Sequence, residues 1–307
     1  MLCAWPLFGQ SLDTGIKLYQ NKQFDLAGET FDKIKSSDPA YAEARYYLGR
    51  IAFDQEEYDD AWDYFKDATK ADDTQAKYFT WIGNSVGTMA QSAGKLRQAT
   101  LAPKIKNAYK KAAELDPKDM DAQWGLVQFY TQAPGFMGGS YEKAEVAARA
   151  ILEVNKAEGH DALATVYMSK DEPEKAEKEY LAACEIEPQR LGSLGVFYQN
   201  QAWYNKAFDT FQKAFGKYPE NMSLLYQVGR TSALSGTRPE LGIESLERYI
   251  KETESDKAAP SHAAAKMRMA MIYEKQGDKA KAKGLYEASL KEDPNMELAK
   301  KGLKRVK

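Results

Sequence analysis

Apolar and small side chains recur along this chain in pairs of amphipathic segments that are separated by short polar turns. In the second segment of each pair, aromatic residues and alanines follow one another at intervals of three and four. Residues 204–214 illustrate this spacing with Tyr204, Ala207, Phe211 and Ala214. Residues three and four apart lie on the same face of an α-helix, so the pattern predicts helices with one apolar stripe.

The first segment of most pairs carries a glycine or an alanine in its apolar stripe, such as Gly49 or Gly195. A small residue there allows two paired helices to approach closely. Many pairs end in Asp-Pro or Glu-Pro, as at Asp116-Pro117. Proline disfavours helical geometry in the residue before it, so these dipeptides mark the ends of helices.

The pattern predicts about eight helix pairs and a final amphipathic helix over residues 295–307. We expect the final helix to cover the last pair with Leu298, Leu303 and Val306, as the terminal cap of a repeat array does. The expected pairs are 11–37, 40–71, 75–116, 119–155, 157–187, 189–218, 221–256 and 261–292.

These positions resemble the signature of the tetratricopeptide repeat (TPR) family over essentially the whole chain after Ser11. The unit that begins at Tyr41, for example, has Leu48, Gly49, Tyr58 and Phe65 in phase with it. The resemblance implies an all-α fold, a right-handed superhelical solenoid of about eight helix-turn-helix units with a C-terminal capping helix. We expect residues 11–307 to form this single domain.

Three units depart from the repeat. The third contains an additional segment at residues 87–103, which we expect to lengthen one or both of its helices. The fourth has additional residues at its turn, in the sequence QAPGFMGGS at 132–140. The seventh has Gly242 where alanine is expected and matches least well. The two insertions together resemble a group of bacterial TPR proteins.

The glycine-rich turn of the fourth unit is a candidate loop site formed by Gly135, Gly138, Gly139 and Ser140. Glycines allow unusual backbone angles, and Ser140 is placed to cap the next helix. A glycine turn that leads into a helix can hold an anion. The alternative is a packed connection between helices, which the absence of a Walker lysine-serine ending favours.

The resemblance further implies that the first helix of each unit lines a concave groove. Aromatic residues and arginine dominate binding hot spots, and arginine pairs strongly with carboxylates. The aromatic residues have a second interpretation, as packing between neighbouring units. The predicted groove residues are Tyr46, Arg50, Phe53, Asn84, Leu126, Phe129, Tyr130, Tyr226 and Arg230.

One TPR subfamily holds the acidic C-terminus of heat-shock chaperones with a clamp of lysine and asparagine. The matching positions here are Leu12, Ile16, Tyr46 and Arg50, and Asn84 stands without a clamp lysine. This departure argues against a chaperone-tail adaptor.

Charge and composition exclude several classes of function. The formal net charge is −2, from 43 basic and 45 acidic residues that are interleaved, whereas a nucleic-acid-binding domain has a basic excess. Two cysteines and two histidines without metal-ligand spacing give no basis for a metal, a cofactor or a His-based triad. We therefore predict a scaffold that binds a protein or peptide and is not an enzyme. The alternative is a small-molecule or anion carrier that uses the 132–140 loop.

Residues 1–10 are apolar and uncharged, unlike the rest of the chain. They fit either the remnant of a secretory signal or, in the second interpretation, a short disordered tail or a hydrophobic cap on the first helix. The first interpretation predicts a periplasmic or secreted protein that serves a cell-envelope complex, and the second a cytoplasmic one. No apolar run reaches the roughly 20 residues of a membrane span. The sequence does not define the oligomeric state.

Overall fold

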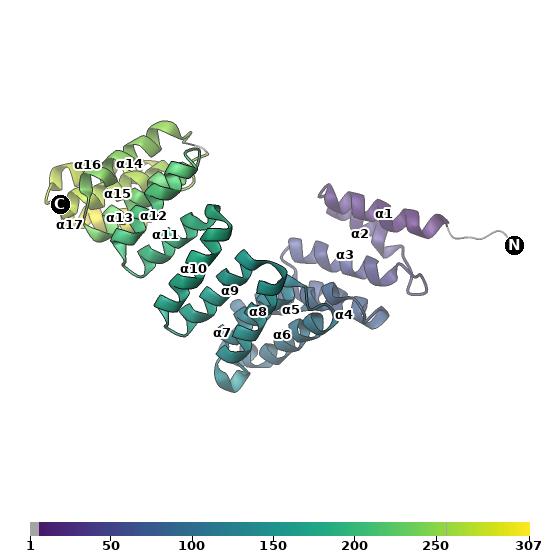
Figure 1. The fold of residues 1–307 in the computed structure, drawn as a ribbon. Coiled ribbons are helices and arrows are strands. Elements are labelled where there is room, and N and C mark those ends of the chain that lie inside the picture. The colour runs from purple at the N-terminus through teal and green to yellow at the C-terminus, as the bar shows by residue number, and fades with distance from the viewer. Residues whose placement is uncertain (1–5, 256) are drawn as a thin grey trace. The chain divides into compact units, whose positions relative to one another are not determined.

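The computed structural model describes residues 6–255 and 257–307, and within them it contains helices and no strand. The helices form two compact units, one up to Glu179 and the other from Tyr180 to Lys307. Figure 1 shows their order along the chain. The eight predicted pairs and the final helix are all present, so the predicted helical repeat is confirmed.

The first unit contains the first four pairs, the helix α9 and the start of α10. The boundary at Glu179 falls inside α10. Its helices are α1 (Pro6–Gln20), α2 (Phe24–Asp32), α3 (Tyr41–Asp54), α4 (Tyr58–Ala71), α5 (Ala76–Gln91), α6 (Lys95–Leu115), α7 (Met120–Gln132), α8 (Tyr141–Val154), α9 (Lys156–Ser169) and α10 (Pro173–Ile186), with the 3₁₀ turn η1 (Gly135–Met137).

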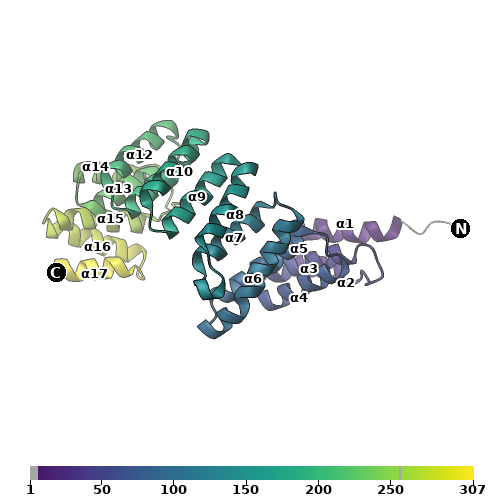
Figure 2. The same cartoon turned by 60° about the horizontal axis from the view of Figure 1, so that its bottom comes forward.

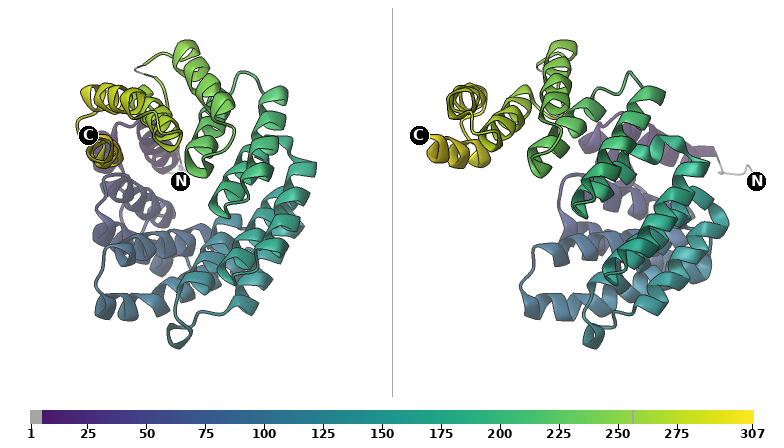
Figure 3. Two further views of the ribbon diagram at one scale, coloured as in Figure 1. Left: turned by 90° about the vertical axis from the view of Figure 1, so that its left-hand side faces the viewer. Right: turned by 60° about the vertical axis from the view of Figure 1, so that its left-hand side comes forward.

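The second unit begins within α10 and contains three further pairs and the terminal helix, drawn from green to yellow in Figure 3. Its elements are the 3₁₀ turn η2 (Pro188–Arg190), α11 (Leu191–Asn200), α12 (Tyr204–Lys217), α13 (Ser223–Ser235), α14 (Pro239–Glu252), α15 (His262–Lys275), α16 (Lys279–Glu292) and α17 (Glu297–Val306).

A glycine of the first helix packs against a ring of the second helix in regular pairs. A Cβ atom built on Gly49 would lie 2.6 Å from Phe65, and one built on Gly195 would lie 2.4 Å from Phe211. Both phenylalanines are fully buried. The glycine at this place in the pattern is therefore required by the ring that covers it.

The two insertions have different structures. The segment in the third unit lengthens the helices, because α5 has 16 residues and α6 has 21, whereas α3 and α4 have 14 each. Figure 2 shows α5, α6 and α7 in sequence. The insertion in the fourth unit contains η1 and leads into α8. The predicted extension of the third unit is confirmed.

Both ends of the chain differ from expectation. Helix α1 begins at Pro6, five residues before the expected start at Ser11, and residues 1–5 lie outside the described part. At the other end Leu298 is 54% exposed and does not cover the last pair. Val306 is buried and Leu303 is partly buried against the same cluster, as predicted, and Ala299 and Gly302 are buried as well, because these residues lie on the side of α17 that packs around Tyr286.

Candidate functional site

An arginine on α3 lies against aromatic rings from the first and third pairs. The guanidinium carbon of Arg50 is 3.8 Å from the centre of the Trp81 ring and 5.7 Å from that of Tyr19. Its Nη1 donates to the hydroxyl of Tyr46 over 3.0 Å. We call Tyr19, Tyr46, Arg50 and Trp81 the Arg50 cluster. Cation–π contacts of this kind hold the guanidinium in place.

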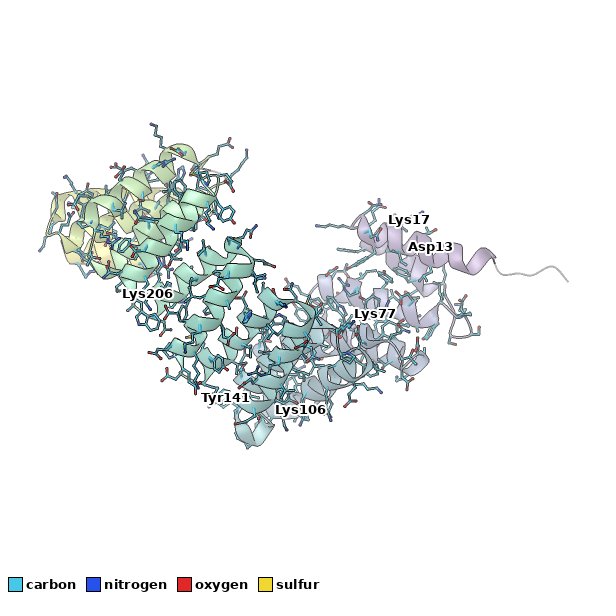
Figure 4. All side chains as sticks on the ribbon, in the orientation of Figure 1. Asp13, Lys17, Lys77, Lys106, Tyr141 and Lys206 are labelled. Atoms are coloured by element: carbon cyan, nitrogen blue, oxygen red, sulfur yellow. The ribbon has the colours of Figure 1, made fainter. Side chains whose placement is uncertain are left out.

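The charge of Arg50 has no counter-ion within the described part of the chain. It makes no ion pair there, and its buried Nε has no hydrogen-bond partner. Two carboxylates of the same helix bond to other groups: Asp54 accepts from Tyr19, and Glu43 accepts from Lys77 and Tyr78. Figure 4 labels Lys77. Within the described residues the guanidinium is therefore held by aromatic rings and a hydroxyl, and not by a carboxylate.

Tyr46 and Phe53 connect this cluster to its surroundings in different ways. Tyr46 is only 7% exposed and packs between Phe65 and Tyr78, so its ring belongs to the core. Phe53 is half-buried and lies edge-on to Trp81, with ring centres 5.0 Å apart. Tyr46 therefore serves packing between neighbouring units and does not line a groove. Phe53 lies between the Arg50 cluster and a cavity.

This cavity has a volume of about 420 Å³. It is lined by α5, α6, α7 and residues 133–137, with Phe53 of α3 at one side. Three predicted groove residues meet there, namely Phe53, Asn84 and Phe129. The glutamines of its wall were not predicted from the sequence, because glutamines in helices carry no pattern that separates them from ordinary surface residues. These glutamines are Gln91, Gln98, Gln128 and Gln132.

Asn84 is fixed by Tyr109 at the cavity wall. Its Oδ1 accepts a hydrogen bond of 2.7 Å from the Tyr109 hydroxyl, and the Tyr109 ring packs against Gly83 and Gly125. Burial raises the pKa of the Tyr109 phenol, so the hydroxyl stays protonated and remains a donor. With its oxygen bonded to Tyr109, the side chain of Asn84 keeps its amide nitrogen as a donor.

The other predicted groove residues of α7 are buried. Leu126 and Tyr130 are 7% and 9% exposed and belong to the core around α7 and α8. Phe129 is 8% exposed and packs edge-on against Tyr130, although one side of it borders the cavity. Leu126 and Tyr130 therefore do not line the cavity, and they pack in the same core cluster as the lining residue Phe129.

The glycine loop is held together by its own backbone. The amides of Gly138, Gly139 and Ser140 donate to the carbonyl oxygens of Gly135, Pro134 and Tyr130. These amides are thus already used, and a bound anion would have to replace those carbonyls. The Ser140 side chain caps α8 by accepting from the amide of Lys143, and it donates to the Glu142 carboxylate.

The glycines of this loop serve its close packing. Gly138 has a φ of 101°, and a Cβ built on Gly139 would lie 1.8 Å from the carbonyl oxygen of Ala133. Gly135 faces open space. The Lys106 side chain of α6 approaches Gly138, and Figure 4 labels it together with Tyr141 at the start of α8. The packed connection therefore describes this loop better than an anion site does.

The second unit contains the remaining two predicted residues. Tyr226 is 5% exposed and packs against Tyr249. Arg230 donates to the side-chain oxygen of Gln199 over 2.5 Å. Burial, and then the charge of Arg268, lower the pKa of the Arg230 guanidinium. Arg230 is thus partnered by a carboxamide, whereas Arg50 in the first unit is stacked on a tryptophan.

Two further findings concern the described residues alone. No group of three or more His, Cys, Asp and Glu side chains there is arranged to hold a metal ion. None of the helices described has both the length and the apolar character that crossing a bilayer requires.

Three segments match the tetratricopeptide repeat family, at residues 12–76, 157–190 and 263–296. The family resemblance that the sequence pattern predicted is confirmed for these segments. No curated protein matches the chain.

Two solved structures resemble this chain. A tetratricopeptide repeat protein from Parabacteroides merdae ATCC 43184 is 14% identical, with a TM-score of 0.51 over 97% of this chain and 98% of its own. The MamA protein is 21% identical over 60% of this chain and 93% of its own, with a TM-score of 0.48. The first of these supports the solenoid fold alone.

Proposed function

We propose that this chain, which carries tetratricopeptide repeats, is a non-catalytic scaffold that binds a peptide segment of a partner protein. The binding surface lies on the first unit and is formed by the Arg50 cluster and the cavity beside it. The observation that carries the proposal is the guanidinium of Arg50, which is stacked on Trp81 and has no counter-ion in the described chain.

The surroundings of Arg50 favour a carboxylate ligand. Stacking on Trp81 and the hydrogen bond to Tyr46 fix the plane of the guanidinium before a ligand arrives. A fixed fork loses less entropy on binding than a flexible lysine and can donate two parallel hydrogen bonds. An acidic side chain or a C-terminal carboxylate of the partner fits this group.

A pull-down with the full chain as bait, from separate envelope and cytoplasmic extracts, identifies the partner. Charge reversal by Arg50→Glu is expected to weaken the complex at least about tenfold, as for the loss of a charge-assisted hydrogen-bonded pair. Arg149→Glu is the matched control, since Arg149 is exposed on α8 and its one ion pair among the described residues is with Glu145. Equal affinity of both variants and the wild type would place the partner on another surface.

Arg230 provides a second arm of the same experiment. Its guanidinium is already bonded to Gln199, so Arg230→Glu tests whether the second unit also contributes to binding. Both reversals are checked for unchanged helicity by circular dichroism. A partner found in the envelope extract alone would support the proposal that the protein is exported and serves a cell-envelope complex.

A further inference from the structure

The cavity in the first unit is a product of the two insertions. The segment 87–103 supplies lining residues from both α5 and α6, and residues 133–137 of the fourth unit close one side. A pair of the regular length would have neither wall. The two departures from the repeat, which are separate in sequence, therefore meet at one place in the structure.

The cavity has an apolar floor and a rim of carboxamides. Phe53, Ile105, Phe129 and Met137 contribute the apolar surface. Gln98 is tied to the backbone, because its Nε2 donates to the Ala90 carbonyl. The side chains of the other rim glutamines are exposed and make no hydrogen bond in the described part of the chain. They are Gln91, Gln128 and Gln132.

Charge is absent from this lining. None of the described residues that border the cavity is charged, although charged residues make up 29% of the chain. A charged ligand group placed here would lose its hydration without gaining a counter-ion, which is unfavourable. The occupant of the cavity is therefore uncharged where it touches this wall.

The rim matches the hydrogen-bonding groups of a peptide backbone. A carboxamide carries both a donor and an acceptor, as a peptide group does. In peptide recognition, main-chain hydrogen bonds give affinity and side-chain pockets give specificity. At this cavity the apolar floor accommodates one side chain and provides specificity, and the carboxamide rim binds the flanking main chain and provides affinity.

We propose that the cavity is the anchor site for one large uncharged side chain of the partner peptide. The peptide groups on either side of that residue pair with Gln91, Gln128 and Gln132. This inference rests on the proposed function and names the ligand more closely. The partner segment places an apolar residue in the cavity and a carboxylate against Arg50. The two sites adjoin, because Phe53 at the cavity wall contacts Trp81 and Trp81 stacks on Arg50.

The probe is a display library of random 12-residue peptides, selected on the immobilised full chain. Dissociation constants of the enriched peptides are then measured by fluorescence anisotropy for the wild type, for Arg50→Glu and for five variants that test the cavity. Ala102→Leu and Gly87→Leu fill the cavity from α6 and α5, where both residues border it. Ala99→Leu, on the exposed side of α6, is the control for filling. Gln128→Ala tests the rim.

A second control matches the rim variant. Gln212 is exposed on α12 of a regular pair, so Gln212→Ala removes a carboxamide that the site does not use. All variants are compared with the wild type by circular dichroism and by the urea midpoint of unfolding. The two substitutions that fill the cavity lie on different helices. If one variant fails to fold, the other still tests whether filling the cavity weakens peptide binding.

Enriched peptides are expected to share one large apolar residue. Filling the cavity should weaken their binding at least about tenfold, as expected for excluding one buried apolar side chain. Gln128→Ala should weaken it about threefold to tenfold, as for one lost hydrogen bond. Ala99→Leu and Gln212→Ala should leave the dissociation constants unchanged.

Three results would overturn the inference in distinguishable ways. Peptides whose binding depends on Arg50 but is indifferent to both filling variants would leave the proposed function in place and remove the anchor site. Failure to enrich any peptide would remove the proposed function as well. Binding of a neutral oligosaccharide that the filling variants abolish, without peptide binding, would assign the cavity to another class of ligand.

Discussion

The third and sixth helix pairs share one packing contact and differ in what surrounds it. In the sixth pair, Gly195 of α11 faces the ring of Phe211 on α12. In the third, Gly83 of α5 faces the ring of Tyr109 on α6 in the same manner. Yet α6 has 21 residues and α12 has 14. The insertion thus preserves the contact that pairs the helices and adds surface beyond it.

The difference between the two rings is chemical as well. Phe211 is fully buried and has no polar atom, while the hydroxyl of Tyr109 holds Asn84 at the wall of the cavity. Tyr109 also faces Gly125 of the next pair. A position that serves packing alone in the regular pair therefore also orders a candidate binding surface in the extended one.

Removing either ring should have the largest effect. Phe211→Ala and Tyr109→Ala are each expected to lower the free energy of unfolding by about 3–5 kcal/mol, because each leaves a cavity against a glycine. Urea denaturation followed by circular dichroism measures this. A loss below about 1 kcal/mol for Tyr109→Ala alone would show that the extended pair does not depend on the shared contact.

The loop that distinguishes the fourth pair can be tested at two glycines. Gly139→Ala places a Cβ against the Ala133 carbonyl and is expected to cost about 1–3 kcal/mol or to rearrange the loop. Gly135→Ala is the control, since nothing lies within 4 Å of the added Cβ. Hydrogen exchange of residues 133–140 should rise in the first variant only. Equal exchange in both would contradict the packed structure of this loop.

The hydroxyl of Tyr109 can be separated from its ring. Tyr109→Phe converts the third pair to the chemistry of the sixth and should cost about 0.5–1.5 kcal/mol, the usual contribution of one hydrogen bond. It should also release Asn84 and weaken peptide binding at the cavity. The stability effect is obtained from urea unfolding and the binding effect from anisotropy. A variant that is unchanged in both would show that Tyr109 acts as a phenylalanine does.

The smallest effect concerns the turn of the regular pair. Ala202 is exposed and has a φ of 56°, a left-handed conformation that favours glycine. Ala202→Gly is therefore expected to raise the free energy of unfolding by about 0.5–1 kcal/mol. Gly277→Ala is the reverse test, since Gly277 has a φ of 83° with no atom near its missing Cβ. If Ala202→Gly and Gly277→Ala both stabilised the protein, the left-handed backbone conformation could not be the cause of either effect.

The sequence predicted the helix pairs because their cause is local and periodic. Spacings of three and four, a glycine facing a ring, and proline at helix ends are each visible in the chain itself. The same periodicity misplaced Leu298, because α17 has two apolar edges and only its docking on Tyr286 decides which one is buried.

The candidate site was predictable only in part. Arg50, Phe53 and Asn84 were expected from their places on first helices, and the structure places them at or beside the cavity. The rim glutamines and Trp81 were not identified, since their role depends on where two insertions meet in space. Leu126 and Tyr130 were expected in the groove but are buried, because α7 is covered by α8 of its own pair and by α6 and α9 of the neighbouring pairs.

The most direct test of the proposed function is hydrogen exchange of the full chain with and without the captured partner. Binding at the proposed surface predicts slower exchange in α3, α5, α7 and residues 133–137, and unchanged exchange in the regular pair α11–α12. Protection confined to α11–α12, with no change around Arg50 and the cavity, would contradict it.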